Sequence, residues 1–187
     1  MQNDIQDKIN TLDRISGWVT NCDTKSSIMM ALVGVFISII FTSDFLLNSL
    51  QDFFVPISLY WKTGSGTFSL FITIIILFFI GTIICLLLAL FHLIKSLSAK
   101  TCSMQTGDVN LRTNSLIHYG SIQKTSYDIF KSTVLAETED NRLDDILSQI
   151  YINSKRCQEK FDDYNKSIKL IKFGIILFVI FVLLLII

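Results

Sequence analysis

The chain has 187 residues, of which 51% are hydrophobic and 17% are charged, and its mean hydropathy is +0.54. These values exclude an ordinary water-soluble globular domain, in which charged residues are more frequent. The formal net charge is zero, so overall electrostatic attraction gives no reason to expect a nucleic acid polymer as a partner.

The N-terminal segment, residues 1–27, is predicted to be a cytoplasmic amphipathic helix. Apolar or small side chains recur at intervals of three and four residues between Ile5 and Cys22, which places them on one helix face. We expect this helix to continue directly into the apolar stretch that follows. That stretch comes after a polar segment and is not followed by a small-residue cleavage site, so we expect it to be retained and not removed as a secretory leader.

Three apolar stretches, at residues 28–47, 68–94 and 168–187, are each expected to cross a bilayer. At about 1.5 Å per residue, the first two are long enough to span a hydrocarbon core of ~30 Å. The third is uninterrupted only from Phe173 onward, and this part covers only ~22 Å. The last span is therefore either a simple tail anchor or a short helix that perturbs the membrane, and the sequence leaves both open.

The sixteen basic residues predict the orientation of the chain. Residues 48–67 contain one of them, Lys62, whereas residues 1–27 contain three and the part of the chain after the second span contains the other twelve. Because basic residues accumulate on the cytoplasmic side, residues 48–67 are expected to form a short extracytoplasmic loop at the membrane surface. The N-terminus and both larger polar segments are then cytoplasmic.

Residues 95–167 are predicted to form a cytoplasmic helical domain. After a polar loop that ends near Asn114 and Ser115, which are candidate caps, helical periodicity runs over residues 116–135. A second periodic pattern continues from about Arg142 into the third span without a break. The predicted fold class is an all-α membrane protein with three transmembrane helices and a cytoplasmic helical bundle, in which the first and third spans continue cytoplasmic helices.

No motif for catalysis, metal binding or cofactor binding is found, so we expect neither enzymatic activity nor a cofactor. The patterns HExxH, GxSxG and GxxxxGK[ST] are missing, and the two histidines are His92 and His118. The four cysteines lack the spacing of a zinc site and are expected to be free thiols. No span carries a charge near the middle of the membrane, which argues against a channel or transporter subunit.

Two pairs of neighbouring residues are candidates for binding a ligand. Asp23 and Lys25 precede the first span and suit an ion pair, anionic lipid headgroups or a ligand phosphate. His118 and Tyr119 begin the middle helix and can stack on a base or merely pack against the protein. These alternatives stay open on sequence alone.

Two further features point to partners of the chain. Lys155 and Lys160 lie in a charged stretch of the last helix, which is either a solvated surface or a site for an external partner. Small residues at four-residue intervals along the first span, including Gly34 and Ser38, would let another helix approach closely. A homo-oligomer embedded in the lipid bilayer is therefore expected.

Three stretches of the chain carry a resemblance to a known family. They are WVTNCDTKSSIMMALVG at residues 18–34, LIHYGSIQKTS at residues 116–126, and LDDILSQIYINSKRCQEKFDDYNKSI at residues 143–168. In their order and in the expected topology, they resemble the small transmembrane effectors of Pycsar, the pyrimidine cyclase system for antiphage resistance.

The resemblance implies an antiphage effector in the bacterial inner membrane. Such a protein would bind cyclic CMP or cyclic UMP made by a partner pyrimidine cyclase after phage infection, and would then impair the membrane in an abortive infection. The candidate ligand-binding residues under this hypothesis are Asp23, Lys25, His118, Tyr119, Lys155 and Lys160. The alternative is a non-enzymatic membrane anchor or scaffold that recruits a soluble partner through its cytoplasmic helices.

Overall fold

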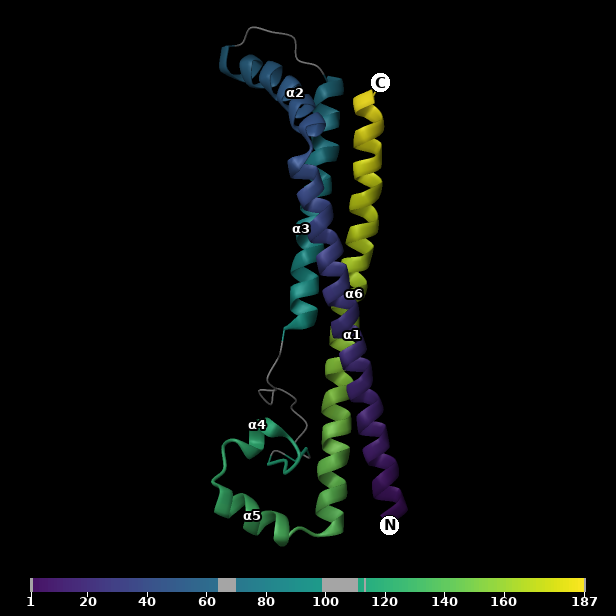
Figure 1. The fold of residues 1–187 in the computed structure, drawn as a ribbon, viewed down its shortest axis with the longest axis vertical. Helices are drawn as coiled ribbons and strands as arrows, with labels where there is room; N and C mark the ends of the chain where they lie inside the picture. Colours follow the sequence, from purple (N-terminus) through teal and green to yellow (C-terminus); the bar gives the residue numbers. More distant parts are fainter. Residues whose placement is uncertain (1, 64–69, 99–110, 113, 187) are drawn as a thin grey trace. The chain divides into compact units, whose positions relative to one another are not determined.

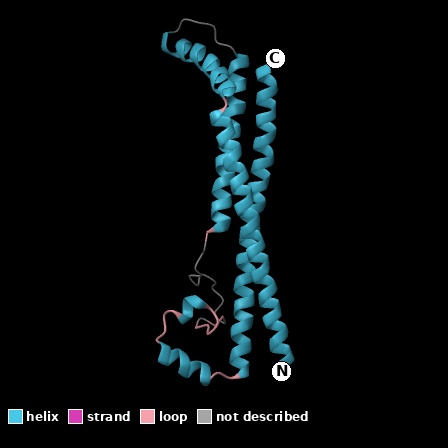
Figure 2. Ribbon diagram, viewed as in Figure 1, coloured by secondary structure: helices cyan, strands magenta, loops and turns pink. Residues whose placement is uncertain are grey.

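The computed structural model describes residues 2–63, 70–98, 111–112 and 114–186, and the regular secondary structure within these ranges is helical (Figure 2). The helices, labelled in Figure 1, are α1 (Gln2–Thr42), α2 (Asp44–Thr63), α3 (Leu70–Leu97), α4 (Tyr119–Ile122), α5 (Tyr127–Leu135) and α6 (Glu139–Ile186). The predicted all-α class is confirmed. The arrangement of a cytoplasmic bundle stays a prediction.

The chain divides into two compact units, and α1 and α6 contribute to both. Unit 1 comprises Met1–Asp23 and Ser98–Phe161, and unit 2 comprises Thr24–Leu97 and Asp162–Ile187. Each of the two long helices continues without a break from one unit into the other, as the hydrophobic periodicity predicted. The N-terminal amphipathic segment and the first apolar stretch therefore belong to one helix.

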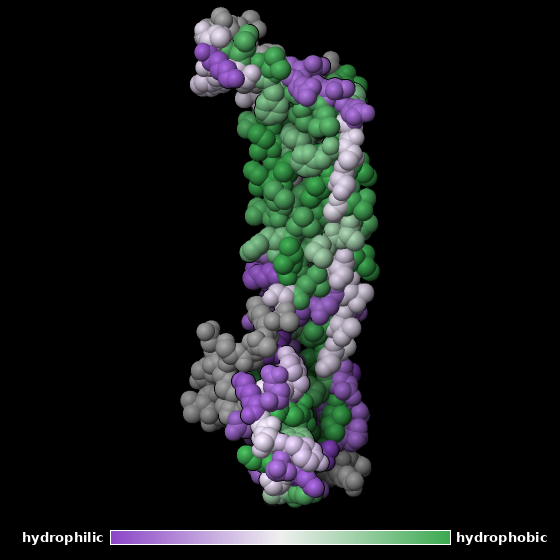
Figure 3. Space-filling model, turned by 60° about the vertical axis from the view of Figure 1, so that its left-hand side comes forward, coloured by the Kyte–Doolittle hydropathy of each residue, from purple (hydrophilic) through white to green (hydrophobic). Residues whose placement is uncertain are grey.

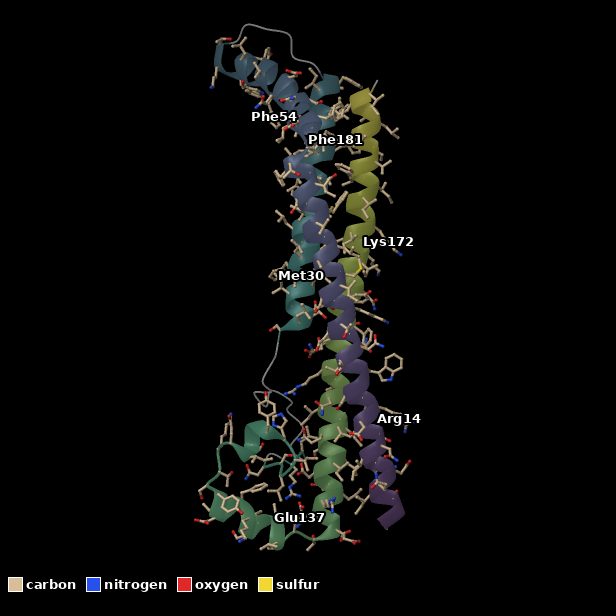
Figure 4. All side chains as sticks on the ribbon, viewed as in Figure 1. Arg14, Met30, Phe54, Glu137, Lys172 and Phe181 are labelled. Carbon is tan, nitrogen blue, oxygen red and sulfur yellow. The ribbon has the colours of Figure 1, made fainter. Side chains whose placement is uncertain are left out.

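Unit 2 is built from α1, α3 and α6 with α2, and it contains two buried apolar clusters. One buried cluster joins α1 to α3 and α6, and consists of Val33, Ile40, Leu86, Ala89, Leu93 and Ile171. A second cluster joins α2 to α3 and α6, where Phe181 points from α6 toward α3 (Figure 4) and its ring lies 5.1 Å from that of Phe79. Both clusters exclude water from the contacts between the helices.

The outer surface of unit 2 is also apolar, which is the property of a protein in contact with lipid. Side chains such as Leu32, Leu77 and Leu183 are more than half exposed, and on the face drawn in Figure 3 hydrophobic residues make up most of the surface of α3 and its neighbours in this unit. Three helices, with bounds Asp4–Thr42, Leu70–Leu97 and Glu139–Ile186, are long and apolar enough to cross a membrane. Among the described residues they contain the three predicted spans, except that the first ends at Thr42.

Two glycines allow α3 and α6 to approach each other closely within unit 2. A Cβ atom at Gly174 of α6 would lie 3.2 Å from the Cβ of Cys85 on α3. A Cβ atom at Gly81 of α3 would lie 3.2 Å from Cδ1 of Leu177 on α6. Small residues commonly mark such close contacts between membrane helices, where van der Waals packing drives association.

A buried carboxylate forms a second link between α3 and α6. Asp163 is 4% exposed, and its Oδ1 accepts hydrogen bonds from Nδ1 of His92 and from Nζ of Lys95, each at 3.1 Å. Because a buried charge is costly without partners, these two donors account for its position on the inner face of α6.

The predicted loop at residues 48–67 was wrong for residues 48–63, which belong to α2. Ser43 begins this helix as a cap: its side-chain oxygen accepts from the backbone N–H of Leu46, and its carbonyl accepts from that of Leu47. Asp44 in the first turn adds a favourable interaction with the helix dipole. The same cap explains why residues 43–47 do not continue α1 as expected. Residues 64–67 lie outside the described ranges.

The single helix predicted over residues 116–135 is two short helices, α4 and α5. Between them, Ser126 has an extended backbone, with φ −65° and ψ 151°. Ser121, Thr125 and Ser126 cluster around this break, and hydroxyl side chains of this kind favour turns over helix interiors. The last helix, α6, begins at Glu139, before the expected start near Arg142, and Thr138 caps it by accepting from the N–H of Asn141.

Candidate functional site

A cavity of about 550 Å³ lies in unit 1, beside α4 and α5. Its size falls in the range of about 300–1,000 Å³ that is typical of small-molecule sites. The described residues that line it come from α5, from α4 and the turn after it, and from the segment before α4; they are Arg112, Asn114, Ser115, Leu116, Ser121, Ile122, Lys124, Thr125, Ile129, Phe130 and Thr133.

The charged side chains among these lining residues are both basic. Arg112 is held in place by Glu137, at the junction of α5 and α6 (Figure 4): its Nη1 lies 3.1 Å from Oε1 of Glu137 and also donates to the carbonyl oxygen of Asn141. Lys124 is exposed in the turn that follows α4. The cavity therefore favours a negatively charged ligand.

The remaining polar lining groups are mainly hydroxyls, and the backbone already orients several of them. Ser115 is buried, and its Oγ accepts from the N–H groups of Ile117 and His118, which leaves the hydroxyl proton available to donate elsewhere. Thr133 donates to the carbonyl of Ile129 at 2.7 Å, so its oxygen can accept from a ligand. Donors and acceptors are thus both present.

Side chains of α6 fix the segment that forms the wall of the cavity. Oδ2 of Asp145 accepts from the backbone N–H of Leu116 at 2.7 Å, and Oγ of Ser148 accepts from the backbone N–H of Arg112 at 3.2 Å. Asp145 is 1% exposed, and its other carboxylate oxygen has no hydrogen-bonding partner among the described residues. A movement of this segment would therefore change its hydrogen bonds to α6.

A smaller cavity of about 400 Å³ adjoins the first. The two share Leu116 and Phe130 as lining residues, so the Phe130 ring lies where both can contact it. The smaller cavity also contains Glu137, Glu139 and Arg142, and it is therefore less favourable to an anion than the larger one.

Two of the six predicted ligand-binding residues contact each other. Nζ of Lys160 lies 2.6 Å from Oδ1 of Asp23, which joins α6 to α1 within unit 1. The nearby rings of Trp18 and Phe161 pack edge to face across the same pair of helices, 6.4 Å apart. The charge of Lys160 is thus compensated by the protein itself.

The other two predicted lysines lie on separate helices. Lys25 is exposed on α1 and belongs to unit 2, whereas Lys155 belongs to unit 1. Nζ of Lys155 lies 4.3 Å from the centre of the Tyr151 ring, one turn earlier on α6, in a cation–π contact. Lys155 is therefore packed against an aromatic ring of its own helix.

The rings of His118 and Tyr119 lie against each other, with their centres 4.9 Å apart and their planes tilted by 37°. Burial lowers the pKa of His118 below its ordinary value of 6.5, the positive charge of Arg156 lowers it further, and Asp145 offsets part of this. Without a bound ligand, the imidazole is therefore mainly neutral at pH 7. None of the six predicted residues lines either cavity.

Sequence reasoning missed the basic and aromatic residues of the larger cavity. Arg112 lies in a polar stretch without periodicity, and Lys124 lies in a break that was interpreted as helix. The signal that could have found them is the cluster of hydroxyl residues at 121–126, which predicts a turn, because a turn beside a helix can expose a lysine and an aromatic face to the same space.

The comparisons with known proteins agree on one family. A family model described as Pycsar effector protein domain matches residues 9–187. A curated relative from Gulbenkiania mobilis, described as Pycsar effector protein GmPycTM, is 31% identical over 178 residues, which cover 94% of this chain and 89% of the relative. No solved structure matches the chain.

Proposed function

Because this chain belongs to the Pycsar effector family, we propose that it is an antiphage defence effector that cyclic CMP or cyclic UMP activates to impair the bacterial inner membrane. The observation that carries the proposal is the family match over residues 9–187, which includes the three apolar helices and unit 1 except for the first residues of the chain. A partner pyrimidine cyclase would supply the nucleotide. The protein itself would act without catalysis.

The continuity of α1 and α6 supports a direct mechanism. Both helices contribute to unit 1 and to the apolar unit 2, so a change in how they pack in unit 1 can reach the membrane segments without another protein. A ligand causes such a change only if it binds one packing arrangement better than the other. A shift from 1:99 to 99:1 requires about 5.5 kcal/mol of differential binding, which several subunits can supply together.

We place unit 1 in the cytoplasm, with the protein as a homo-oligomer. The distribution of basic residues supports the orientation, since Lys62 alone lies between the first two spans. The small-residue face of the first span supports association: a Cβ atom added at Gly34 would meet no atom of the described residues within 4 Å, and Ala31 and Ser38 are exposed. A second subunit can occupy this face.

Measurement of membrane potential in growing bacteria tests this function. Cells that express the protein are combined with an active pyrimidine cyclase or with a catalytically dead one, and a potential-sensitive dye is read during phage infection. We expect depolarisation with the active cyclase alone. Unchanged potential in cells that accumulate cyclic CMP and cyclic UMP would contradict the proposal.

A replacement of the spans separates the effector from the scaffold alternative. If unit 1 only recruits a soluble partner, an unrelated membrane anchor in place of the three apolar helices should preserve defence. The effector function instead requires these helices, so the chimera should express and bind nucleotide but give no depolarisation.

A further inference from the structure

We propose that the larger cavity of unit 1 is the nucleotide site, with Lys124 and Arg112 at the cyclic phosphate and Phe130 against the pyrimidine ring. This inference rests on the proposed function for the identity of the ligand. The lining of the cavity supports this chemical class, because two basic side chains, several hydroxyl groups and an aromatic ring suit a small anion that carries a flat ring.

The charge of the lining selects an anion of low charge. Arg112 and Lys124 are basic, and the other described lining residues are uncharged. Glu137 compensates part of the Arg112 charge at 3.1 Å, so the net attraction suits a phosphodiester with one negative charge better than a nucleoside triphosphate. The Lys124 ammonium is exposed and can turn toward a bound phosphate.

The Phe130 ring provides the surface for a base. It is half-buried on α5 and lines both cavities, and its neighbours Ile129 and Leu116 are apolar. Stacking of a base on an aromatic side chain contributes about 1–3 kcal/mol, which corresponds to about 5- to 150-fold in affinity. The hydroxyls of Ser115 and Thr133 lie in the same cavity and suit the carbonyl and hydroxyl groups of a nucleoside.

The wall of this cavity connects the ligand to α6. The segment that carries Arg112 and Leu116 is held by hydrogen bonds to Ser148 and Asp145 of α6. A ligand that moves this segment must therefore change these hydrogen bonds, and α6 continues from them into unit 2. A ligand bound at this site can therefore change the position of α6.

Binding of cyclic CMP and cyclic UMP to the purified full-length protein in detergent, measured by calorimetry, tests the assignment. Lys124→Glu and Phe130→Ala should each weaken binding at least fivefold, whereas Phe130→Tyr should retain it because the ring is preserved. Lys131→Glu is the matched control, since Lys131 is an exposed lysine on α5 that lines neither cavity, and it should change the affinity less than twofold.

The outcomes separate this inference from the function it rests on. If the wild-type protein binds nucleotide and both Lys124→Glu and Phe130→Ala bind it within twofold of wild type, the cavity assignment is overturned and the proposed function stands. If the folded wild-type protein binds neither nucleotide, the activation by cyclic pyrimidine nucleotides is itself wrong. Circular dichroism of Phe130→Ala confirms that any loss of binding occurs in a folded protein.

Discussion

Lys160 of α6 contacts Asp23 of α1 at 2.6 Å, so two side chains that are 137 residues apart in sequence neutralise each other. Both were candidates for ligand contacts on sequence alone. Their pairing joins α1 to α6 within unit 1, and their role in binding a ligand stays a prediction.

The Asp23–Lys160 pair should show coupling in a double-mutant cycle. We expect Asp23→Asn and Lys160→Met each to lower the thermal stability of the detergent-solubilised protein, and the double variant to lose less than their sum. The pair is partly exposed, with side-chain exposures of 38% and 17%, so a coupling energy of about 1 kcal/mol is expected. Purely additive losses would show that the contact does not contribute.

Asp163→Asn should destabilise the contact between α3 and α6. Burial raises the pKa of Asp163, but hydrogen bonds from Lys95 and His92 and their charges outweigh this, so the pKa lies below its ordinary value of 3.8. The folded state therefore favours the ionised carboxylate. Its contribution to the stability of the fold is present above pH ~4 and is lost as the pH falls through the lower pKa of the folded state.

Thermal denaturation at several pH values measures this effect. At pH 7, Asp163→Asn should lower the free energy of unfolding by about 1.5–3 kcal/mol, the range for hydrogen bonds to charged groups. The difference in the free energy of unfolding between this variant and wild type should become smaller as the pH is lowered below 4. Asp162→Asn serves as the control because Asp162 is exposed; equal losses in both variants at pH 7 would refute the special role of Asp163.

His118 should make unit 1 less stable in mild acid. Its pKa in the folded protein lies below 6.5, so the unfolded chain takes up the proton first. Stability should then fall as the pH decreases from about 7 toward the folded pKa, and no further below it. His118→Asn removes this titration, so its melting temperature should depend less on pH between 7.5 and 5.5 than that of wild type. An unchanged pH dependence would be inconsistent with a half-buried imidazole whose pKa is lowered in the folded protein.

Gly174→Leu should force α3 and α6 apart in unit 2. Even a Cβ atom at this position lies 3.2 Å from the Cβ of Cys85, which is part of a helix and can give way only if the helices move. Overpacking of this kind costs about 1–3 kcal/mol or more. We expect lower thermal stability in detergent than for Gly17→Leu, a position where nothing lies within 4 Å. Similar stabilities would show that the helices are not in close contact at Gly174.

The orientation can be read by cysteine labelling in intact cells. In a background without native cysteines, Lys62→Cys should react with a membrane-impermeant maleimide added from outside the inner membrane, because residue 62 lies in α2 between the first two spans. Lys131→Cys should react only after the membrane is permeabilised. Labelling of residue 131 in intact spheroplasts would place unit 1 on the wrong side for a cytoplasmic ligand.

The long helices could be predicted from the sequence because their signal is local and repeated. Apolar residues recur through α1 and α6 over many turns, and a lipid-exposed span such as α3 needs no tertiary contact to be recognised. The start of α2 depends on a single cap at Ser43, and the break between α4 and α5 depends on a few hydroxyl residues. Such weak local signals were outweighed by the surrounding pattern.

The cavity could not be predicted because it depends on contacts between distant parts of the chain. The hydrogen bond from the backbone N–H of Leu116 to Asp145 joins residues that are 29 positions apart in the sequence. The hydrogen bond from the backbone N–H of Arg112 to Ser148 joins residues that are 36 positions apart. No periodicity marks these pairs in advance. The sequence indicated charged residues as ligand-binding candidates, but it could not show that the charges of Lys160 and Asp23 compensate each other.

The most direct test of ligand-driven membrane damage is the permeability of liposomes that contain only the purified protein. A fluorescent dye is enclosed, cyclic CMP or cyclic UMP is added to the side that unit 1 faces, and release is followed over time. We predict release with at least one of these nucleotides, and none with the same nucleotide added to liposomes carrying Lys124→Glu. Intact liposomes under conditions in which the reconstituted wild-type protein binds the nucleotide would contradict the claim that this protein itself converts ligand binding into membrane damage.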